Sequence, residues 1–521
     1  MNRITASAPT SAVLHDVGNA ITSESRDLWL WPGHRSAKNV ALLVVVAAVV
    51  ALTYWVVVVT PYAFADDYAI FVHSQTDELV FRDLTVDGRP IMGLLDQMVF
   101  ARLDSVNQVR YLRLFGLAGT IGFACMLYGA LRQQWPSREA AALGALSIVF
   151  LPAFQVHVAW AQYWVTPFAC LLGGRAAHYA SRCSRATAGC DVRSAFRAIG
   201  LFLVALTIYQ PSAMMFWFFI AVIELPAGGR AQTSMVRLRW PAMVAGIAMV
   251  LDFAVVRLSS LLVHFVDRRS ALVQDPLMKV LWFVRTPLIG ALNPYALHAS
   301  TRVGAAVGMA LLIGLAAFFR GPWPQRFAWI GLAAGFLALA YFPVLIVAES
   351  WPSFRTRQAL SALVVLYCGL AAIGYKRLLQ RHFRLPSQGW GTVLAAAGVT
   401  GFALLASAHV TNYFAVPQML ERLMLRDRLA ACHIGAATGV WVVRPDWTQT
   451  AAPGVLYDEF GLPSSFHAWA VVPMVRCVLA DLKQRPAPLP VRSFGPHEAL
   501  PPAPKGVIVV DMRQLRHFAG R

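Results

Sequence analysis

Two adjacent carboxylates, Asp66 and Asp67, directly follow the first long apolar run of the chain, within the stretch PYAFADDY at 61–68. Because neighbouring negative charges repel each other, the pair needs an explanation. A structural explanation is that the two acids begin a helix and stabilise its N-terminus. A chemical explanation is that one carboxylate acts as a general base, which accelerates attack by a hydroxyl group about 10²- to 10⁴-fold. The residues alone leave both interpretations open.

Five arginines, four in the connections between apolar runs and one inside the run 240–265, are candidates for binding a phosphate group. A leaving phosphate needs positive charge where its negative charge accumulates, and it needs no strong acid. The structural interpretation of Arg89 is that it ends a turn after Asp87-Gly88. Arg355 and Arg357 follow an expected span, where arginine commonly extends to the lipid headgroups. The five are Arg89, Arg257, Arg285, Arg355 and Arg357.

Two residues close to these arginines, Glu349 and Trp351, are candidates for contacting a substrate. Trp351 offers an aromatic face on which a substrate can stack, whereas a glutamate at the end of a span is commonly just solvated. Asp252 lies inside an apolar run, where a charged group is costly, so we expect it to pair with a polar group of a neighbouring helix. Two carboxylates alone are an incomplete metal site, so a divalent cation is an open question.

The composition places these residues in a membrane protein. Of the 521 residues, 58% are hydrophobic and only 14% are charged, and the mean hydropathy is +0.56. Ordinary soluble domains are about half apolar and a quarter charged, so a soluble globular enzyme and a disordered chain are both excluded. The net charge is +19, but the basic residues lie in short loops between apolar runs. We interpret this charge as membrane topology and not as a nucleic-acid surface.

The apolar runs predict an all-α polytopic membrane protein with eleven transmembrane helices. Two of the expected spans are short and meet at Tyr209-Gln210-Pro211, as a tight hairpin or a single kinked helix. The expected spans cover residues 39–60, 112–131, 140–160, 164–180, 198–209, 212–225, 240–265, 303–319, 327–347, 359–375 and 390–410.

The distribution of arginine and lysine predicts the orientation in a bacterial inner membrane. Loops around residues 132–138, 175–197, 230–239, 320–326 and 376–384 are basic, whereas the connections near Ala161 and Gln210 contain no lysine or arginine. The positive-inside rule therefore places the N-terminus in the cytoplasm and, with an odd number of spans, the C-terminus in the periplasm. We expect a cytoplasmic tail (1–38), a transmembrane domain (39–410) with periplasmic loops 61–111 and 266–302, and a periplasmic segment (411–521).

The C-terminal segment differs in composition from the rest of the chain. Strand-like runs at 439–443 and 507–510 and a helical stretch at 472–482 predict a small α/β appendage. Cys432 and Cys477 are the two cysteines that we place in the oxidising compartment, where a disulfide between them is a hypothesis.

Several short motifs recur in a known group of membrane enzymes. Asp66-Asp67-Tyr68 after the first span is followed by Gly88-Arg89-Pro90, by an amphipathic stretch at 91–96 and by Ile208-Tyr209-Gln210. With the topology, these motifs resemble glycosyltransferases of the GT-C class and, more narrowly, the bacterial glucosyltransferase family that modifies lipopolysaccharide O-antigen. The resemblance covers residues 40–410, and the YDEFG stretch at 457–461 matches no catalytic motif.

The resemblance implies a GT-C-like catalytic domain with a periplasmic active site. It implies that a sugar, expected to be glucose, passes from a polyprenyl-phosphate donor to a hydroxyl of a lipid-linked or surface glycan such as O-antigen. Asp66 or Asp67 would be the base, and Tyr68 and Gln210 would contact substrate. The expected partners are this donor, the acceptor glycan and membrane lipids. The alternatives are a transporter or flippase of lipid-linked sugars, or a glycan polymerase or ligase; the absence of a sequence repeat argues against a transporter.

Overall fold

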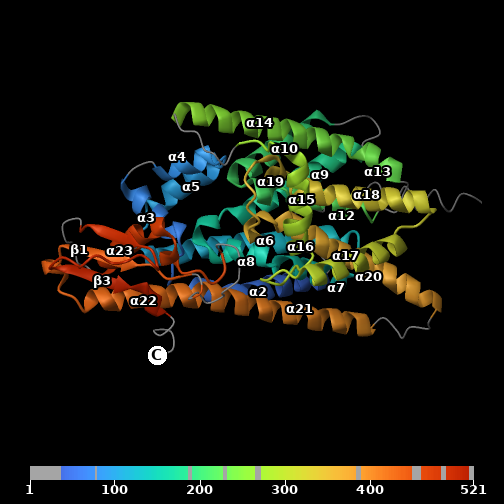
Figure 1. Cartoon of the computed structure of the whole chain (residues 1–521). Coiled ribbons are helices and arrows are strands. Elements are labelled where there is room, and N and C mark those ends of the chain that lie inside the picture. Colours follow the sequence, from blue (N-terminus) through green and yellow to red (C-terminus); the bar gives the residue numbers. More distant parts are fainter. Residues whose placement is uncertain are drawn as a thin grey trace, which may run out of the picture.

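A computed structural model describes most of the chain. The described residues are 37–76, 79–135, 137–185, 191–226, 231–263, 271–382, 389–446, 448, 459–482 and 489–515, so most of the expected N-terminal tail lies outside them. Figure 1 shows long helices that run side by side, with a small sheet at one end of the bundle. This part of the chain is a helical membrane protein with a small C-terminal sheet.

Six helical stretches among the described residues are long and apolar enough to cross a membrane. In four of them, which contain α2, α14, α17 and α21, 33% or less of the most apolar stretch is buried inside the protein, so most of their side chains are available to lipid. The principal helices of the six stretches are α2 (Ala37–Val59), α6 (Val109–Arg132), α14 (Arg239–Val263), α17 (Thr301–Phe318), α20 (Gln358–His382) and α21 (Gly389–Val410).

The prediction of eleven spans is wrong, since the described helices supply six, or seven if one bent pair counts as a span. That pair, at the expected span 140–160, bends by 63° where Pro152 begins the second helix. Four other expected spans are helices that are too short or too polar to cross a membrane. They lie at 164–180, 198–209, 212–225 and 327–347. These elements are α7 (Arg138–Val149), α8 (Pro152–Ala159), α9 (Thr166–Arg185), α10 (Val192–Ile208), α11 (Gln210–Ala213), α12 (Met215–Glu224), α18 (Trp323–Ala340) and α19 (Phe342–Ile346).

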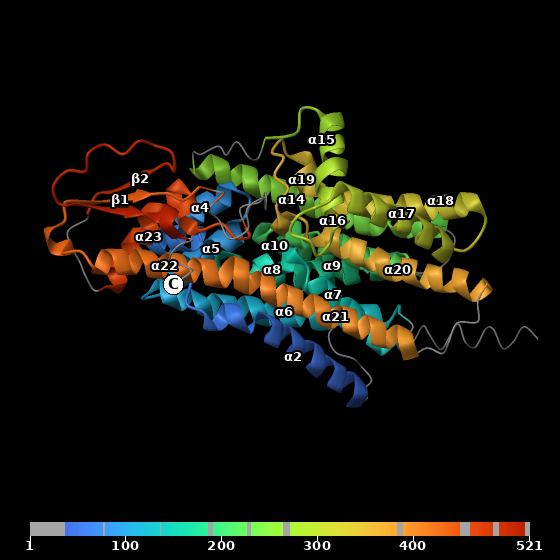
Figure 2. The same cartoon turned by 60° about the horizontal axis from the view of Figure 1, so that its bottom comes forward.

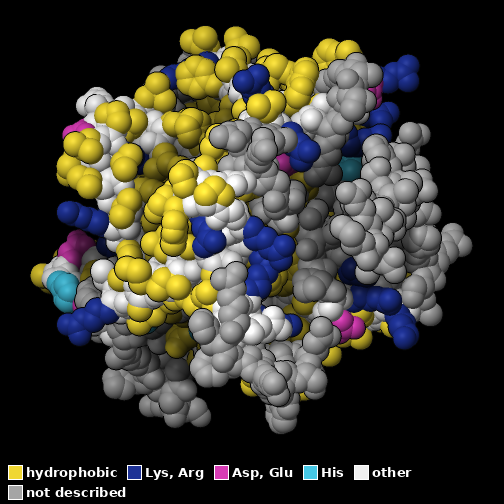
Figure 3. Space-filling model, turned by 90° about the vertical axis from the view of Figure 1, so that its right-hand side faces the viewer, with side chains coloured by type: hydrophobic (Ala, Val, Ile, Leu, Met, Phe, Trp, Pro, Cys, Tyr) yellow, Lys and Arg dark blue, Asp and Glu magenta, His cyan; other side chains and the backbone are white. Residues whose placement is uncertain are grey.

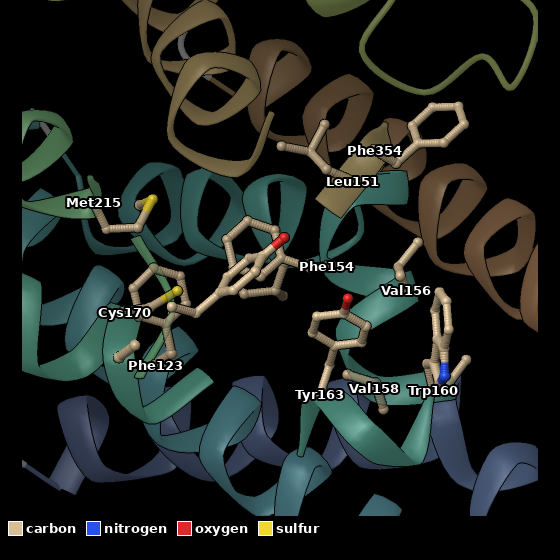
Figure 4. Close-up of a cluster of buried hydrophobic side chains, with 14 of the residues drawn as sticks. Phe123, Leu151, Phe154, Val156, Val158, Trp160, Tyr163, Cys170, Met215 and Phe354 are labelled. Atoms are coloured by element: carbon tan, nitrogen blue, oxygen red, sulfur yellow. The ribbon is translucent and has the colours of Figure 1, made fainter. Parts of the chain in front are cut away.

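Burial within the protein explains the expected span at 212–225 and the second helix of the bent pair. Every residue of α8 and α12 is buried, and a helix that is apolar on all sides fits a protein core as well as a bilayer. Figure 4 shows part of this core, in which the rings of Phe123 and Phe154 stack with centroids 5.3 Å apart. The sequence pattern could not separate helices that face lipid from helices that face other helices.

The connections at 61–111 and 271–302 are themselves largely helical. Figures 1 and 2 place α3, α4 and α5 at the same end of the bundle as the sheet, and Figure 2 shows α15 standing across the long helices. The elements are α3 (Asp66–Thr76), α4 (Leu79–Val86), α5 (Pro90–Phe100), the 3-10 turn η1 (Val106–Gln108), α15 (Pro276–Phe283), the π-helical turn η4 (Val284–Leu288) and α16 (Ile289–Ala291).

The C-terminal segment forms the predicted α/β unit. Its sheet is parallel, with strand order β2-β1-β3 and with Val440 opposite Val491 and Ile508. Helix α23 lies between β1 and β2 in the chain and packs on α3 and α22. Its elements are α22 (Val416–Ala430), β1 (Gly439–Val443), α23 (Ala468–Asp481), β2 (Val491–Phe494) and β3 (Val507–Asp511).

The structure of this segment differs from the sequence predictions in its N-terminal boundary and in its cysteines. Helix α21 continues through the π-helical turn η6 (Thr411–Ala415) into α22, so the boundary expected at residue 410 falls inside one helical run. The hypothesis of a disulfide is wrong, because Cys432 and Cys477 are both free thiols and Cys477 is buried within α23.

The end of the bundle opposite the sheet carries basic side chains. The C-terminal ends of α17 and α20 and the N-terminal ends of α18 and α21 lie at the end opposite the sheet. Figure 3 views this end and shows lysine and arginine side chains among apolar ones, with few acids. Basic side chains are what the positive-inside rule requires of a cytoplasmic end, and the orientation itself stays a prediction.

Candidate functional site

The two adjacent acids at the start of α3 have different environments. Asp67 is fully buried, and its Oδ2 and Oδ1 accept the backbone N–H groups of Phe64 (3.0 Å) and Gln162 (2.9 Å). Burial raises the pKa of Asp67 to about 6, even though these N–H groups and the charge of Arg113 lower it. Asp67 thus ties the start of α3 to the turn η2 (Ala161–Tyr163). This structural role differs from the capping of the helix N-terminus that the sequence allowed, since neither N–H group belongs to α3.

The turn that leads to Asp66 is held from both sides. Arg113 of α6 is fully buried and donates to the carbonyls of Val57 (2.6 Å), Tyr62 (2.9 Å) and Thr60 (3.2 Å), which satisfies the end of α2. Its guanidinium also lies 3.8 Å from the centroid of the Tyr62 ring. No sequence signal identified Arg113, because its partners lie more than 50 residues away.

Ala65, directly before Asp66, has an unusual backbone conformation. Its φ is +42°, which is strained for a residue with a Cβ atom. Its N–H donates to the Ser464 hydroxyl (3.0 Å), which in turn donates to Gln418 of α22 (2.7 Å). Strained backbone of this kind persists only where the surroundings hold it, and it is common at functional sites.

Asp66 lies on the other side of this turn and lines a cavity of about 230 Å³, the small cavity. Its wall combines acids and arginines with amide and aromatic groups. No group of three possible metal ligands occurs among the described residues. The polar and aromatic residues of the wall are Asp66, His73, Asp83, Asp87, Arg89, Gln162, Tyr163 and Arg355.

A second cavity, the large cavity, has a volume of about 990 Å³. One side is apolar and is formed by α10, α14 and α19, and three residues of the C-terminal segment complete it: Leu462, Phe466 and His467. Asp87, Arg89 and Arg355 line both cavities and therefore form the border between them. The apolar residues include Leu206, Met249, Val250, Phe253, Val256, Leu272, Phe342, Val344, Ile346 and Val347.

The two arginines at this border stand over aromatic rings. The Arg89 guanidinium lies 5.0 Å from the centroid of the Tyr209 ring, and its buried Nε has no hydrogen-bond partner among the described residues. The Arg355 guanidinium lies 5.0 Å from Trp160 and 5.5 Å from Tyr163. A buried donor without a partner, as at Arg89 Nε, is costly, so this border is suited to an anionic group.

The edge of the large cavity is fixed by a contact between distant segments. Gln210 donates through Nε2 to the Gly88 carbonyl and also hydrogen bonds with Asp252 of α14, the polar partner expected for that acid. Gly88 has φ +81°, and a Cβ atom there would lie 2.8 Å from Gln210 Nε2. A side chain at Gly88 would therefore displace the glutamine as well as strain the turn.

The remaining candidates from the sequence fall into two groups. Arg257, Glu349 and Trp351 line the large cavity with Gln210, and Arg257 is exposed on α14. Three others line neither cavity. Arg285 is exposed in η4, Arg357 is buried with its guanidinium 4.5 Å from the Phe354 ring, and Tyr68 is fully buried.

Two carboxylates near the site were missed by the sequence analysis. Asp96 of α5 is fully buried, its Oδ1 accepts the indole N–H of Trp164 (3.0 Å), and burial raises its pKa well above the usual value. Glu459 accepts the N–H groups of Phe354 and Arg355 from the turn η5 (Phe354–Thr356). Neither role has a local signal, because each partner comes from a distant part of the chain.

The site as a whole fits an amphipathic molecule with an anionic centre. An apolar tail matches the large cavity, an anion matches the arginines at the border, and a polar group with a reactive hydroxyl matches the small cavity beside Asp66.

Among known proteins, no family model matches the chain, and no curated protein matches it at a significant level.

Proposed function

We propose that the protein is an integral membrane glycosyltransferase that moves a sugar from a polyprenyl-phosphate donor to a hydroxyl of a glycan. The observation that carries this proposal is the shared border of Asp87, Arg89 and Arg355 between an apolar cavity and a polar one that contains Asp66. The resemblance of the Asp66-Asp67-Tyr68 region to O-antigen glucosyltransferases supports the same function, with glucose as the expected sugar and a periplasmic acceptor.

In this proposal the donor enters from the lipid side. Val250 and Phe253 line the large cavity and have exposed fractions of 68% and 49%, so the α14 wall is continuous with the surface that faces lipid. The polyprenyl chain occupies this apolar space, and Arg89 and Arg355 bind the phosphate, with Arg257 beside the chain. Burial of the chain supplies affinity, while the arginines fix the position of the bond that breaks.

The transfer step then takes place in the small cavity. The acceptor hydroxyl attacks the anomeric carbon, and its proton passes to the Asp66 carboxylate as the new C–O bond forms. The bond between the anomeric carbon and the phosphate oxygen breaks, and its electron pair stays on the phosphate, whose charge the two arginines stabilise. Asp67 is not the base in this scheme, because both of its oxygens are occupied by backbone N–H groups.

The test uses the full-length protein in proteoliposomes with polyprenyl-phosphate glucose labelled in the sugar and an O-antigen glycan acceptor. We expect label in the glycan and release of polyprenyl phosphate in equal amounts. Movement of the labelled lipid across the bilayer without incorporation would support a flippase instead. Asp511→Asn is a suitable control, since Asp511 belongs to β3, pairs with Arg513 (2.7 Å) and lines neither cavity.

A further inference from the structure

A buried glutamate of the C-terminal segment, Glu459, contacts the turn that carries Arg355. Its side chain is fully buried, and its oxygens accept the backbone N–H groups of Phe354 (2.7 Å) and Arg355 (3.0 Å). Its Oε1 also lies 3.7 Å from Nε of the Arg355 guanidinium. One carboxylate therefore holds both the backbone and the side chain of the same arginine.

The Arg355 guanidinium is also held on its other side. It lies over the rings of Trp160 and Tyr163, which form an edge-on pair with centroids 5.1 Å apart and lie side by side in Figure 4. Only 16% of the Arg355 side chain is exposed. A guanidinium between a carboxylate and two aromatic faces has lost most of its rotamer freedom before any ligand binds, and this lowers the entropic cost of binding.

Glu459 itself is anchored by the residues that follow it. The Phe460 ring packs edge-on against Phe354 and Phe414, with centroids 5.2 and 4.9 Å away. The N–H of Gly461 donates to the Tyr413 carbonyl (2.8 Å), and its φ of +80° suits glycine. The glutamate is thereby attached to η6, in the middle of the long helical run from α21 to α22.

We propose that Glu459 is a positioning residue that directs Arg355 toward the phosphate of the lipid-linked donor. The inference rests on the proposed function, because it takes the anion at the border of the cavities to be the donor phosphate. Glu459 lines neither cavity, so it acts through Arg355 and not on the substrate. The C-terminal segment is then a part of the donor site and not an appendage to it.

Because Glu459 is charged, the direction of the change in donor KM distinguishes two effects of its removal. A carboxylate beside an arginine partly neutralises it, so removal of the charge would improve phosphate binding if neutralisation were the main effect. If positioning is the main effect, Glu459→Gln weakens binding, because the amide cannot accept both backbone N–H groups and releases the guanidinium. We expect E459Q to raise KM for the donor about tenfold, the loss typical of one hydrogen bond to a charged group, with KM for the acceptor unchanged. A lower donor KM would overturn the proposal.

A double-mutant cycle separates positioning from a structural role. If Glu459 acts through Arg355, E459Q has no further effect on donor KM in a protein that already carries Arg355→Gln. Additive effects would show that the glutamate only stabilises the fold. Asp481→Asn is the matched control: Asp481 is a carboxylate of the same segment that pairs with Arg422, and neither residue lines a cavity. D481N should leave donor KM unchanged.

A binding measurement distinguishes failure of this inference from failure of the proposed function. Polyprenyl phosphate without sugar is titrated into the full-length protein and into E459Q. A wild-type protein that neither binds this lipid nor transfers sugar would contradict the proposed function. A wild-type protein that does both, with E459Q indistinguishable from it, would contradict only the role of Glu459. If E459Q does not accumulate, Phe460→Leu loosens the same segment without altering the carboxylate and should also raise donor KM.

Discussion

The two cavities meet at the same arginines but differ in size and in the elements that form them. The large cavity takes most of its wall from α10, α14 and α19 and holds about 990 Å³, whereas the small one holds about 230 Å³ and is lined by charged residues from α3 and α4. In the proposed function, the large cavity takes the apolar part of the donor and the small cavity takes the polar part. Changes on the two sides should therefore affect different steps.

The same contrast holds on a smaller scale for the two adjacent acids. Asp67 points inward and is saturated by backbone N–H groups, and Asp66 lines the small cavity. Successive residues at the start of a helix point in directions about 100° apart, so neighbours in the sequence need not share an environment. In the proposed function, Asp66 takes the chemical role and Asp67 stabilises the turn.

The largest effect is expected at Asp66. Asp66→Asn keeps the size of the side chain but removes the basic oxygen, so sugar transfer should fall about 100-fold or more while the protein still accumulates. Asp67→Asn should instead lower the thermal midpoint, since one buried N–H loses its acceptor at a cost of about 1–3 kcal/mol. Incorporation of labelled sugar is measured per amount of folded protein. The opposite result is that D66N transfers sugar normally, whereas D67N loses transfer and keeps its stability. That result would make Asp67 the base and Asp66 the structural residue.

A smaller effect is expected at the border of the cavities. Arg89→Gln removes a charged donor from the anion site, so donor KM should rise about tenfold, and Arg89→Lys should be intermediate because it keeps the charge but loses the planar fork. Arg285→Gln is the control, because this arginine is exposed and lines neither cavity. Equal effects of R89Q and R285Q would argue against a localised phosphate site.

A few-fold rise in donor KM is expected from narrowing the large cavity. Val250→Trp adds bulk to the wall that faces lipid, so KM should rise for a long polyprenyl donor and much less for a short-chain analogue. The matched control is Leu52→Trp on α2, where the side chain is 77% exposed and lines neither cavity. The comparison is made with donors of two chain lengths in the same membranes. A V250W protein that treats both donors alike would place the lipid chain elsewhere.

The smallest effect is expected in the dependence of stability on pH. The folded protein holds a proton at Asp67 with a pKa of about 6, above the ordinary value of 3.8, so this group stabilises the fold most below about pH 4. That contribution is lost as the pH rises through about 6. Thermal midpoints measured between pH 4 and 7 should therefore fall less steeply in D67N than in the wild-type protein. Parallel curves would mean that Asp67 does not titrate in this range.

The sequence predicted parts of the site but not its boundaries. Asp66, Arg89 and Arg355 were among its candidates, because charged residues stand out in a chain of which only 14% is charged. It gave no reason to prefer them to Asp67 or Arg357, which have the same residue types and similar positions in the sequence. The choice depends on whether a side chain lies in a cavity or is buried behind it, and no local pattern encodes that.

By itself, the sequence determined that this is a helical membrane protein with a small C-terminal α/β unit. It did so because hydrophobicity and strand patterning are local properties of the chain. Only the tertiary structure decided which apolar helices fill the protein core, since α12 is as apolar as a lipid-facing helix. It also decided that Glu459 holds a turn 105 residues earlier in the chain. Contacts of this kind depend on how the helices pack, and packing is a property of the whole chain.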